Sequence, residues 1–119
     1  GFDWLPLPDT VSGVTEQLIQ AHNPSWKLGG IRNPGPAARG QLVGAGMEVV
    51  ETFTFDVDVA YAVDSWRRRI SASAGVLDLG ADQAAAFDAE LAEVLADRFP
   101  GDDLIAPHRV WAEVAVRTD

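Results

Sequence analysis

The sequence predicts an α+β domain in which two long strands flank a helical segment. Residues 48–61 predict a long strand, since large apolar side chains occupy every second position from Phe53 to Tyr61, which is the pattern of a strand with one buried face. Residues 109–117 alternate in the same way, and residues 81–99 repeat large apolar side chains at helical spacing. At 119 residues the chain forms a single domain, or part of one, and it is long enough to bury a core.

Two helices are expected before the first long strand. Apolar residues at helical spacing predict a helix over residues 10–21, with Asp9 or Thr10 as its amino-terminal cap. The run 27–36 is rich in glycine and proline and predicts a loop. A short helix is expected over residues 37–45, directly before the strand.

Two further helices are expected between the long strands. Residues 64–74 predict a helix that Asp64 caps and Gly75 ends. Residues 81–99 predict a longer helix, for which Gly80 is a tolerable cap. The last element is the strand over residues 109–117.

The two long strands are too few to form a stable sheet by themselves, so we expect them to belong to a larger sheet. A hairpin alone is marginally stable, yet both strands carry large apolar faces. The chain also opens on GFDWLPLP without an initiator methionine, and its only methionine is Met47. Bulky apolar residues at a terminus are unusual, because termini tend to be exposed and mobile. We therefore expect the chain to be a piece of a longer protein.

Composition narrows the possible functions. The absence of cysteine excludes disulfides, thiolate catalysis and cysteine-based zinc sites, and it fits a cytoplasmic protein. The net charge of −9 disfavours nucleic acid as a partner, since phosphates require a basic face. No run approaches the roughly 18 apolar residues of a membrane span, so no membrane partner is expected.

No motif identifies a catalytic residue, a metal site or a phosphate cradle. The sequence contains no GxGxxG, P-loop or GxSxG pattern. His22 and His108 lie far apart and lack an HExxH-like partner, so a metal site is not expected. His22 follows a helix and is interpreted as a cap or exposed residue, or as a polar group in a substrate cavity. His108 is interpreted as structural or exposed.

Two carboxylates share one face of the first long strand. Asp56 and Asp58 could carry out acid–base work as a pair. The better interpretation is a solvated face, or cross-strand pairing with Arg109 and Arg117.

The run Trp66-Arg67-Arg68-Arg69 lies on the helix over residues 64–74. Trp66 faces inward with Ile70, and core packing alone explains it. The three arginines cannot all point one way. One can pair with Asp64 or Asp78, and one can reach an anionic ligand.

Six stretches of the chain, taken in order, carry a resemblance to a known family. The chain resembles the C-terminal half of class I S-adenosylmethionine-dependent methyltransferases of the small-molecule type, especially actinobacterial ones. The resemblance covers nearly the whole chain. The stretches are FDWLPLP (2–8), AHNPSW (21–26), VGAGMEVVETFTFDVDVAY (43–61), DSWRRRISASAGV (64–76), FDAELAEVLADRFP (87–100) and PHRVWAEVAVR (107–117).

The resemblance implies an α/β, Rossmann-like fold of which this chain supplies the C-terminal part. FDWLPLP would lie at and beyond the end of the fifth strand. Residues 53–61 would form the sixth strand and residues 110–116 the seventh, and these two would make an antiparallel edge. The chain would then be the substrate-facing half, because ligands of open α/β sheets bind at the carboxyl ends of the strands.

The resemblance also implies a function. The chain would be the substrate-recognition part of a methyltransferase acting on a small molecule, and it would not be catalytic on its own. The family's glycine-rich cofactor turn lies in the half that this chain lacks. S-adenosylmethionine is therefore expected in the complete enzyme and no cofactor for this chain alone. The expected substrate contacts are Trp4, His22, Trp26, Trp66 and Arg67.

Two other functions stay open. The chain could be a stand-alone, non-enzymatic module derived from a methyltransferase, which binds a small molecule or dimerises. Its partner would then be a separate N-terminal half or a second copy of the chain. An unrelated α+β enzyme is the third possibility, but the sequence supplies no nucleophile or metal site for it.

Overall fold

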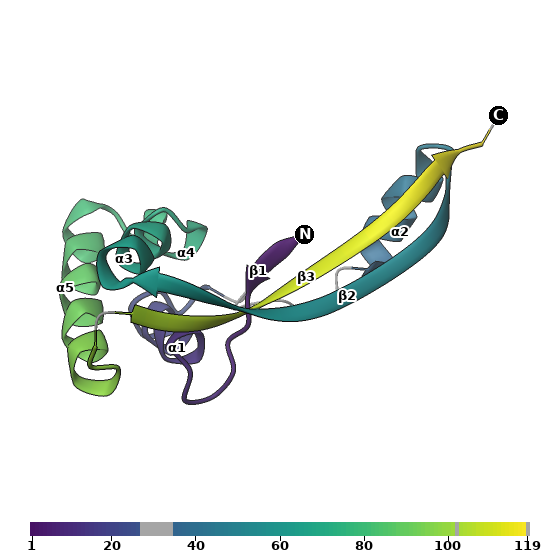
Figure 1. Ribbon diagram of the computed structural model, residues 1–119. Coiled ribbons are helices and arrows are strands. Elements are labelled where there is room, and N and C mark those ends of the chain that lie inside the picture. The colour runs from purple at the N-terminus through teal and green to yellow at the C-terminus, as the bar shows by residue number, and fades with distance from the viewer. Residues whose placement is uncertain (27–34, 102, 119) are drawn as a thin grey trace.

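A computed structural model describes residues 1–26, 35–101 and 103–118. These residues form helices together with one antiparallel sheet, so the α+β prediction is confirmed (Figure 1). The elements in chain order are β1 (Phe2–Trp4), α1 (Val11–His22), α2 (Gly35–Gly44), β2 (Met47–Ala62), α3 (Val63–Ser71), α4 (Ala74–Leu77), α5 (Ala81–Arg98) and β3 (Asp103–Arg117). No helix among these is long and apolar enough to cross a membrane.

The sheet has the strand order β1–β3–β2, with β3 antiparallel to both neighbours. Strand β1 pairs with the middle of β3, where Phe2 lies opposite Val110 and Trp4 opposite His108. The expectation of only two strands is therefore wrong. Three residues are too few to display an alternating pattern, and the pairing of β1 depends on a strand at the other end of the chain.

Strands β2 and β3 extend well beyond the helices that pack against one end of the sheet. Their ladder runs from Ala62 opposite Asp103 to Met47 opposite Arg117. The first end packs with α1, α3, α4 and α5 into a body, and the other end projects from it as a two-stranded arm (Figure 1). Helix α2 contacts this arm. The molecule is consequently elongated, with extents of 55 × 29 × 21 Å.

The core lies in the body, between the helices and the near end of the sheet. The predicted apolar stripes are confirmed: Trp66 and Ile70 of α3 are fully buried, as are Phe87 and Leu91 of α5. Each such side chain gains about 1.5–3 kcal/mol from leaving water. Burial of these stripes therefore positions α3 and α5 against the sheet.

Several expected boundaries need correction. Thr10 is the cap of α1, because its hydroxyl accepts a hydrogen bond from the Gly13 N–H at 3.1 Å. The single helix expected over residues 64–74 is instead two helices, and α3 ends at Ser71. The residue that caps α3 is Ala62, not Asp64. The loop expected over residues 27–36 lies largely outside the described residues, and α2 begins at Gly35.

Gly75 does not end a helix as expected, because it lies buried inside α4. A Cβ there would come within 2.9 Å of the Trp26 ring and 2.8 Å of Ile19. The missing side chain thus lets α4 approach both residues closely. Strand β3 also begins earlier than expected, at Asp103 rather than Arg109, and includes Pro107, a residue that usually argues against a strand interior.

Helix α1 lies so close to the segment after β1 that no side chain fits at Gly13, and a substitution there tests this contact. A Cβ on Gly13 would lie 2.0 Å from the Leu7 carbonyl oxygen, so Gly13→Ala must displace backbone. We expect this change to lower the free energy of unfolding by about 1–3 kcal/mol in urea denaturation.

Gly40→Ala in α2 is the matched control, since a Cβ at that exposed position meets no atom within 4 Å. Alanine there should be neutral or stabilise by about 0.5–1 kcal/mol, because alanine favours the helix. Equal effects of the two substitutions would contradict the contact between Gly13 and Leu7.

Candidate functional site

Two of the tryptophans expected at the substrate converge on one carboxylate. The Trp4 indole N–H donates a hydrogen bond to Glu16 Oε2 at 3.0 Å. The Trp26 indole N–H donates to Glu16 Oε1 at 2.5 Å. Glu16 lies on α1, whereas Trp4 ends β1 and Trp26 follows α1. One side chain therefore joins three segments of the chain.

The third of these tryptophans binds the residue next to Glu16. The Trp66 indole N–H donates to the Thr15 hydroxyl at 3.0 Å. The rings of Trp4 and Trp66 meet edge to face, with centroids 5.9 Å apart. We call Trp4, Trp26, Trp66, Thr15 and Glu16 the tryptophan cluster.

Glu16 is an unusual carboxylate, since only 4% of the residue is exposed. Burial raises its pKa above the ordinary value, and the negative charge of Asp3 acts in the same direction. The two indole N–H groups oppose this shift by stabilising the charged form. A carboxylate with a raised pKa is a better proton acceptor than an ordinary one.

A hollow of about 200 Å³ opens beside Glu16, at the point where the chain leaves β1. We call it the Glu16 hollow. It is bounded by two prolines that follow β1 and by one side of α1: Pro6, Pro8, Gly13, Glu16, Gln17 and Gln20. The hollow has room for a small polar group that donates hydrogen bonds to Glu16 or to the glutamine amides.

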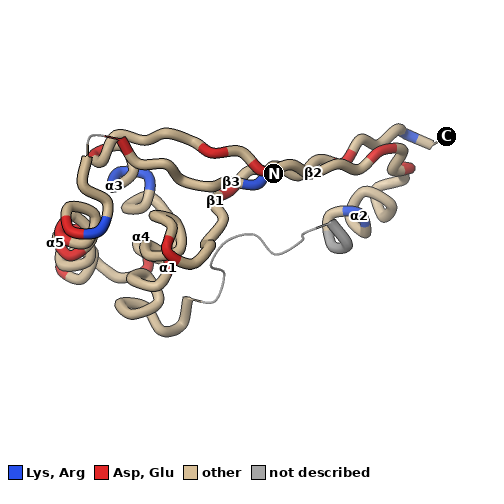
Figure 2. Tube along the Cα trace, turned by 60° about the horizontal axis from the view of Figure 1, so that its bottom comes forward, with Lys and Arg blue, Asp and Glu red and all other residues tan. Residues whose placement is uncertain are grey.

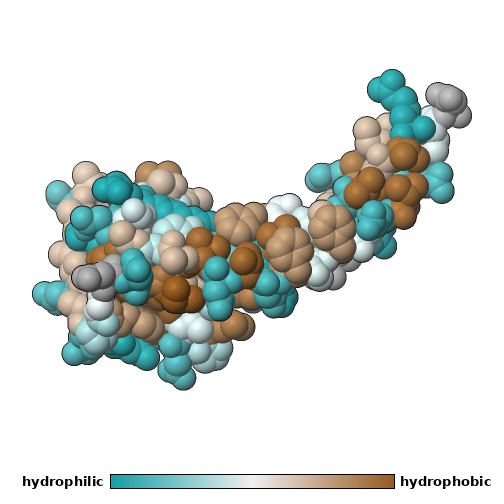
Figure 3. Space-filling view, viewed as in Figure 1, coloured by the Kyte–Doolittle hydropathy of each residue, from teal (hydrophilic) through white to brown (hydrophobic). Residues whose placement is uncertain are grey.

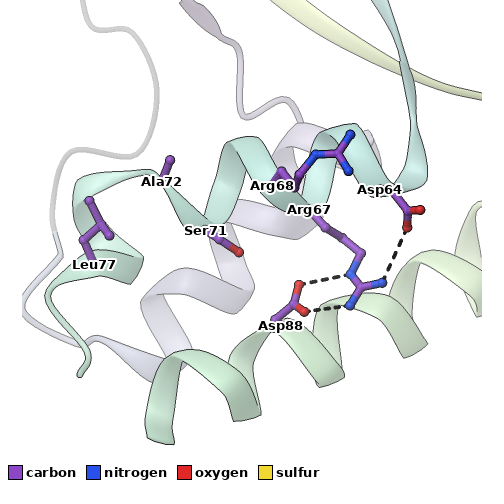
Figure 4. Close-up of a pocket in the computed structure, with 7 residues that line it drawn as sticks. All are labelled: Asp64, Arg67, Arg68, Ser71, Ala72, Leu77 and Asp88. Atoms are coloured by element: carbon purple, nitrogen blue, oxygen red, sulfur yellow. Dashed lines mark hydrogen bonds and ion pairs between the residues drawn. The ribbon is translucent and has the colours of Figure 1, made fainter. Parts of the chain in front are cut away.

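Arg67 faces a different and larger hollow, the Arg67 groove, of about 650 Å³ (Figure 4). Residues of α3, α4 and α5, and the residue that caps α3 at its C-terminal end, line it: Asp64, Arg67, Arg68, Ser71, Ala72, Leu77 and Asp88. The Arg67 guanidinium donates two hydrogen bonds to Asp88, at 3.0 and 2.6 Å, and lies 3.7 Å from Asp64. The expected pairing of one arginine with Asp64 is thus confirmed.

The pairing with Asp88 decides what Arg67 can do in the groove. The hydrogen bonds to Asp88 raise the pKa of Arg67, so the guanidinium keeps its charge. Two carboxylates already face that charge. An anionic ligand would have to displace Asp88, which makes the Arg67 groove the weaker candidate for a substrate site.

His22 lies apart from the tryptophan cluster. Its Nε2 is 2.6 Å from Glu90 Oε2 of α5, and its ring meets Phe87 edge to face at 5.4 Å. Of the five expected substrate contacts, the structure brings together Trp4, Trp26 and Trp66. Trp66 is fully buried in the core, and its role in substrate binding stays a prediction.

A second buried polar centre adjoins the tryptophan cluster. His108 is fully buried on β3, with Nδ1 2.8 Å from the Ala106 carbonyl oxygen and Nε2 beside the Arg69 guanidinium. Arg69 also donates to the Tyr61 hydroxyl at 2.8 Å and lies over the Trp4 ring, 4.9 Å from its centroid. Burial lowers the pKa of His108, and the charge of Arg69 lowers it further.

The two aspartates on one face of β2 have different cross-strand neighbours. Asp56 accepts two hydrogen bonds from Arg109 across the strands, at 2.6 and 3.0 Å, which confirms that expected pairing. The bonds hold the pKa of Asp56 below its ordinary value. The expected pairing with Arg117 is wrong, because Asp58 lies opposite Pro107, whereas Arg117 lies opposite Met47 at the far end of the ladder. Within the described residues, no group of three or more potential metal ligands occurs.

Sequence reasoning missed Thr15, Glu16 and Arg69. The burial of Thr15 was predictable from the sequence. It lies four residues after Val11, on the apolar face of its helix, and that face packs against the core. The roles of Glu16 and Arg69 were not predictable from the sequence, because their partners come from distant segments of the chain.

Comparison with known protein families, with curated proteins and with solved structures finds no match for this chain.

The tryptophan cluster predicts a large effect of a small substitution. Glu16→Gln replaces one acceptor oxygen with an amide that cannot accept the indole hydrogen bond. We expect a loss of about 1–3 kcal/mol in the free energy of unfolding, because a buried N–H then lacks a partner. Urea denaturation followed by tryptophan fluorescence measures this.

Glu90→Gln removes the same charge from a half-exposed carboxylate and is the matched control. Its effect should stay within about 1 kcal/mol, as for other surface ion pairs. A Glu16→Gln variant as stable as the unsubstituted chain would show that the indole contacts contribute nothing.

Burial of His108 predicts a pH dependence. Its folded pKa is lowered, whereas in the unfolded chain it titrates near about 6.5. The unfolded state therefore binds more protons as pH falls below that value, and the folded state loses stability. The stability difference between the chain and its His108→Gln variant should shrink between neutral and mildly acidic pH. A difference that stays constant would contradict this prediction.

Proposed function

We propose that the chain is the substrate-recognition part of an S-adenosylmethionine-dependent methyltransferase that acts on a small molecule. On its own it is not catalytic. A cofactor-binding half supplies S-adenosylmethionine, and this chain supplies the wall against which the methyl acceptor is held.

The observation that carries the proposal is the position of β1 in the sheet. Strand β1 has three residues, lies at an edge, and runs antiparallel to β3 but in the same direction as β2. If β1 is the end of a fifth strand, then β2 is the sixth and β3 the seventh. The strand that runs antiparallel to its neighbours is then β3, the seventh and last strand, as the family resemblance implies. The free edge of β1 is where a cofactor-binding half would continue the sheet.

The Glu16 hollow supports the proposed role in substrate binding. It opens directly after β1, and ligands of open α/β sheets bind at the carboxyl ends of strands. On this proposal Glu16 accepts a hydrogen bond from a hydroxyl or amine of the methyl acceptor. Trp4 and Trp26 hold the carboxylate in place for this contact, since each occupies one of its oxygens. The proposed contacts of His22 and Arg67 lie outside this hollow.

The isolated chain should not bind the cofactor. Isothermal titration of the folded chain with S-adenosylmethionine should give no binding heat, because no glycine-rich cofactor turn is present in its sequence. Micromolar binding would contradict the proposed division of labour between two halves.

The protein in its source cells provides the complementary measurement. An antibody against α5 should detect a polypeptide substantially longer than 119 residues, or a stable complex of this chain with a cofactor-binding partner. Recovery of the 119-residue chain alone, with no such partner, would overturn the proposal.

A further inference from the structure

One face of the arm is apolar from the body to near its tip, where Glu51 and Glu48 lie on it. Residues that lie directly opposite each other in the ladder share a face of the sheet. One such series pairs Val57 with His108, Phe55 with Val110, Phe53 with Ala112 and Glu51 with Val114. We call the apolar members of this series that lie beyond the body, together with Val116, the arm face: Phe53, Phe55, Val57, Val110, Ala112, Val114 and Val116.

The arm face continues the surface that is buried in the body. Leu104, Ala106 and His108 belong to the same face of β3 and are at most 2% exposed. Phe53 and Phe55, farther along, are 42% and 50% exposed. Figure 3 shows these apolar side chains following one another along the arm, outward from the body. The sequence pattern of a buried face thus extends well beyond the part of the sheet that the helices cover.

Helix α2 lies on the opposite face of the arm. Its Arg39 donates hydrogen bonds to Thr52, at 3.1 Å, and to Glu113, at 3.5 Å. Thr52 and Glu113 lie opposite each other and alternate with the arm-face residues. The helix therefore does not account for the apolar side chains of the arm face.

We propose that the arm face binds the arm face of a second copy of this chain, in a two-fold symmetric dimer. The arm face and the adjacent Phe2 expose on the order of 500 Å² of apolar surface, given the 150–250 Å² of a whole aromatic side chain. Two copies together bury about 1,000 Å², which reaches the lower limit of specific interfaces before any polar rim is counted. A two-fold contact covers both exposed faces at once and leaves no surface for further copies.

The side chains of the arm face are self-complementary. Phe53 lies beside Ala112, so a large side chain alternates with a small one across the two strands. In a face-to-face dimer with antiparallel arms, the two-fold axis runs across the strands and places β2 over β2 and β3 over β3 of the second copy. The phenyl rings of the two copies then pack together along β2, and the small Ala112 lets the two β3 strands approach closely. Because Ala112 stands near the middle of the arm face, the two-fold axis passes close to it.

Charge determines the relative direction of the two arms. The strand register leaves the middle of this face without a charged residue and places Glu48 and Glu51 on it toward the tip of the arm. Figure 2 shows acidic residues in that part of the arm. Arms that ran in the same direction would bring these carboxylates of two acidic chains together. The antiparallel arrangement places the acidic tips at opposite ends, each beside the body of the other copy.

The first test measures the oligomeric state of the chain and the effect on it of one charge introduced on the arm face. Sedimentation velocity between about 1 and about 200 µM should show a monomer–dimer equilibrium with a dissociation constant in the micromolar range. Phe55→Glu should raise that constant at least about tenfold. Thr54→Glu adds the same charge at the next residue, on the other face, and should leave dimerisation unchanged. A monomer throughout the range, open-ended oligomers, or equal effects of the two variants would overturn the proposal.

The second test does not depend on how the arm tolerates a charge. The chain contains no cysteine, so single cysteines report the contact directly. Ala112→Cys should form a covalent dimer with a short bis-maleimide reagent, and Thr54→Cys should not. Circular dichroism confirms that both variants are folded. Failure of Ala112→Cys to cross-link, or equal cross-linking of both variants, would contradict pairing through the arm face.

Discussion

Two adjacent residues of α1 accept hydrogen bonds from three tryptophans, and these bonds hold the body together. Thr15 and Glu16 bind tryptophans from β1, from the segment after α1 and from α3. These tryptophans lie at positions 4, 26 and 66 of the chain, and the Arg69–Asp3 ion pair adds a second polar link between α3 and β1. A buried carboxylate is costly unless its oxygens are satisfied, so the cluster stabilises the fold only when all its members are in place. The position of β1, and with it the edge of the sheet, depends on this condition.

The same interaction shapes the proposed substrate site. Glu16 reaches the hollow after β1 because Trp4 and Trp26 hold it from two sides, and Gly13 lets α1 approach the Leu7 carbonyl. A carboxylate held in this way needs no rearrangement to accept a hydrogen bond. A site of this kind is preorganised by the packing of the body. The Arg67 groove differs, since its cation is already paired with Asp88.

Local patterns in the sequence predicted most helices and both long strands, because the period of apolar residues reports the face that each element buries. Contacts between distant segments were not predictable in this way. The three residues of β1 become a strand only beside β3, and the burial of Gly75 depends on Trp26 and Ile19. The helix break before Ala74 carried no strong local sign. For the site, the tryptophans were identified, but the carboxylate that gathers them was found only from the structure.

The insertion of α3, α4 and α5 between β2 and β3 has a consequence for how the molecule folds. The arm is not a local hairpin, because its two strands meet only after the whole helical segment has been closed as a loop. Until then β2 is an unpaired, strongly β-forming stretch without proline, which is the kind of segment that aggregates. Acidic residues interrupt this stretch repeatedly, at Glu48, Glu51, Asp56 and Asp58. They act as gatekeepers that keep nascent chains apart by mutual repulsion while the body forms.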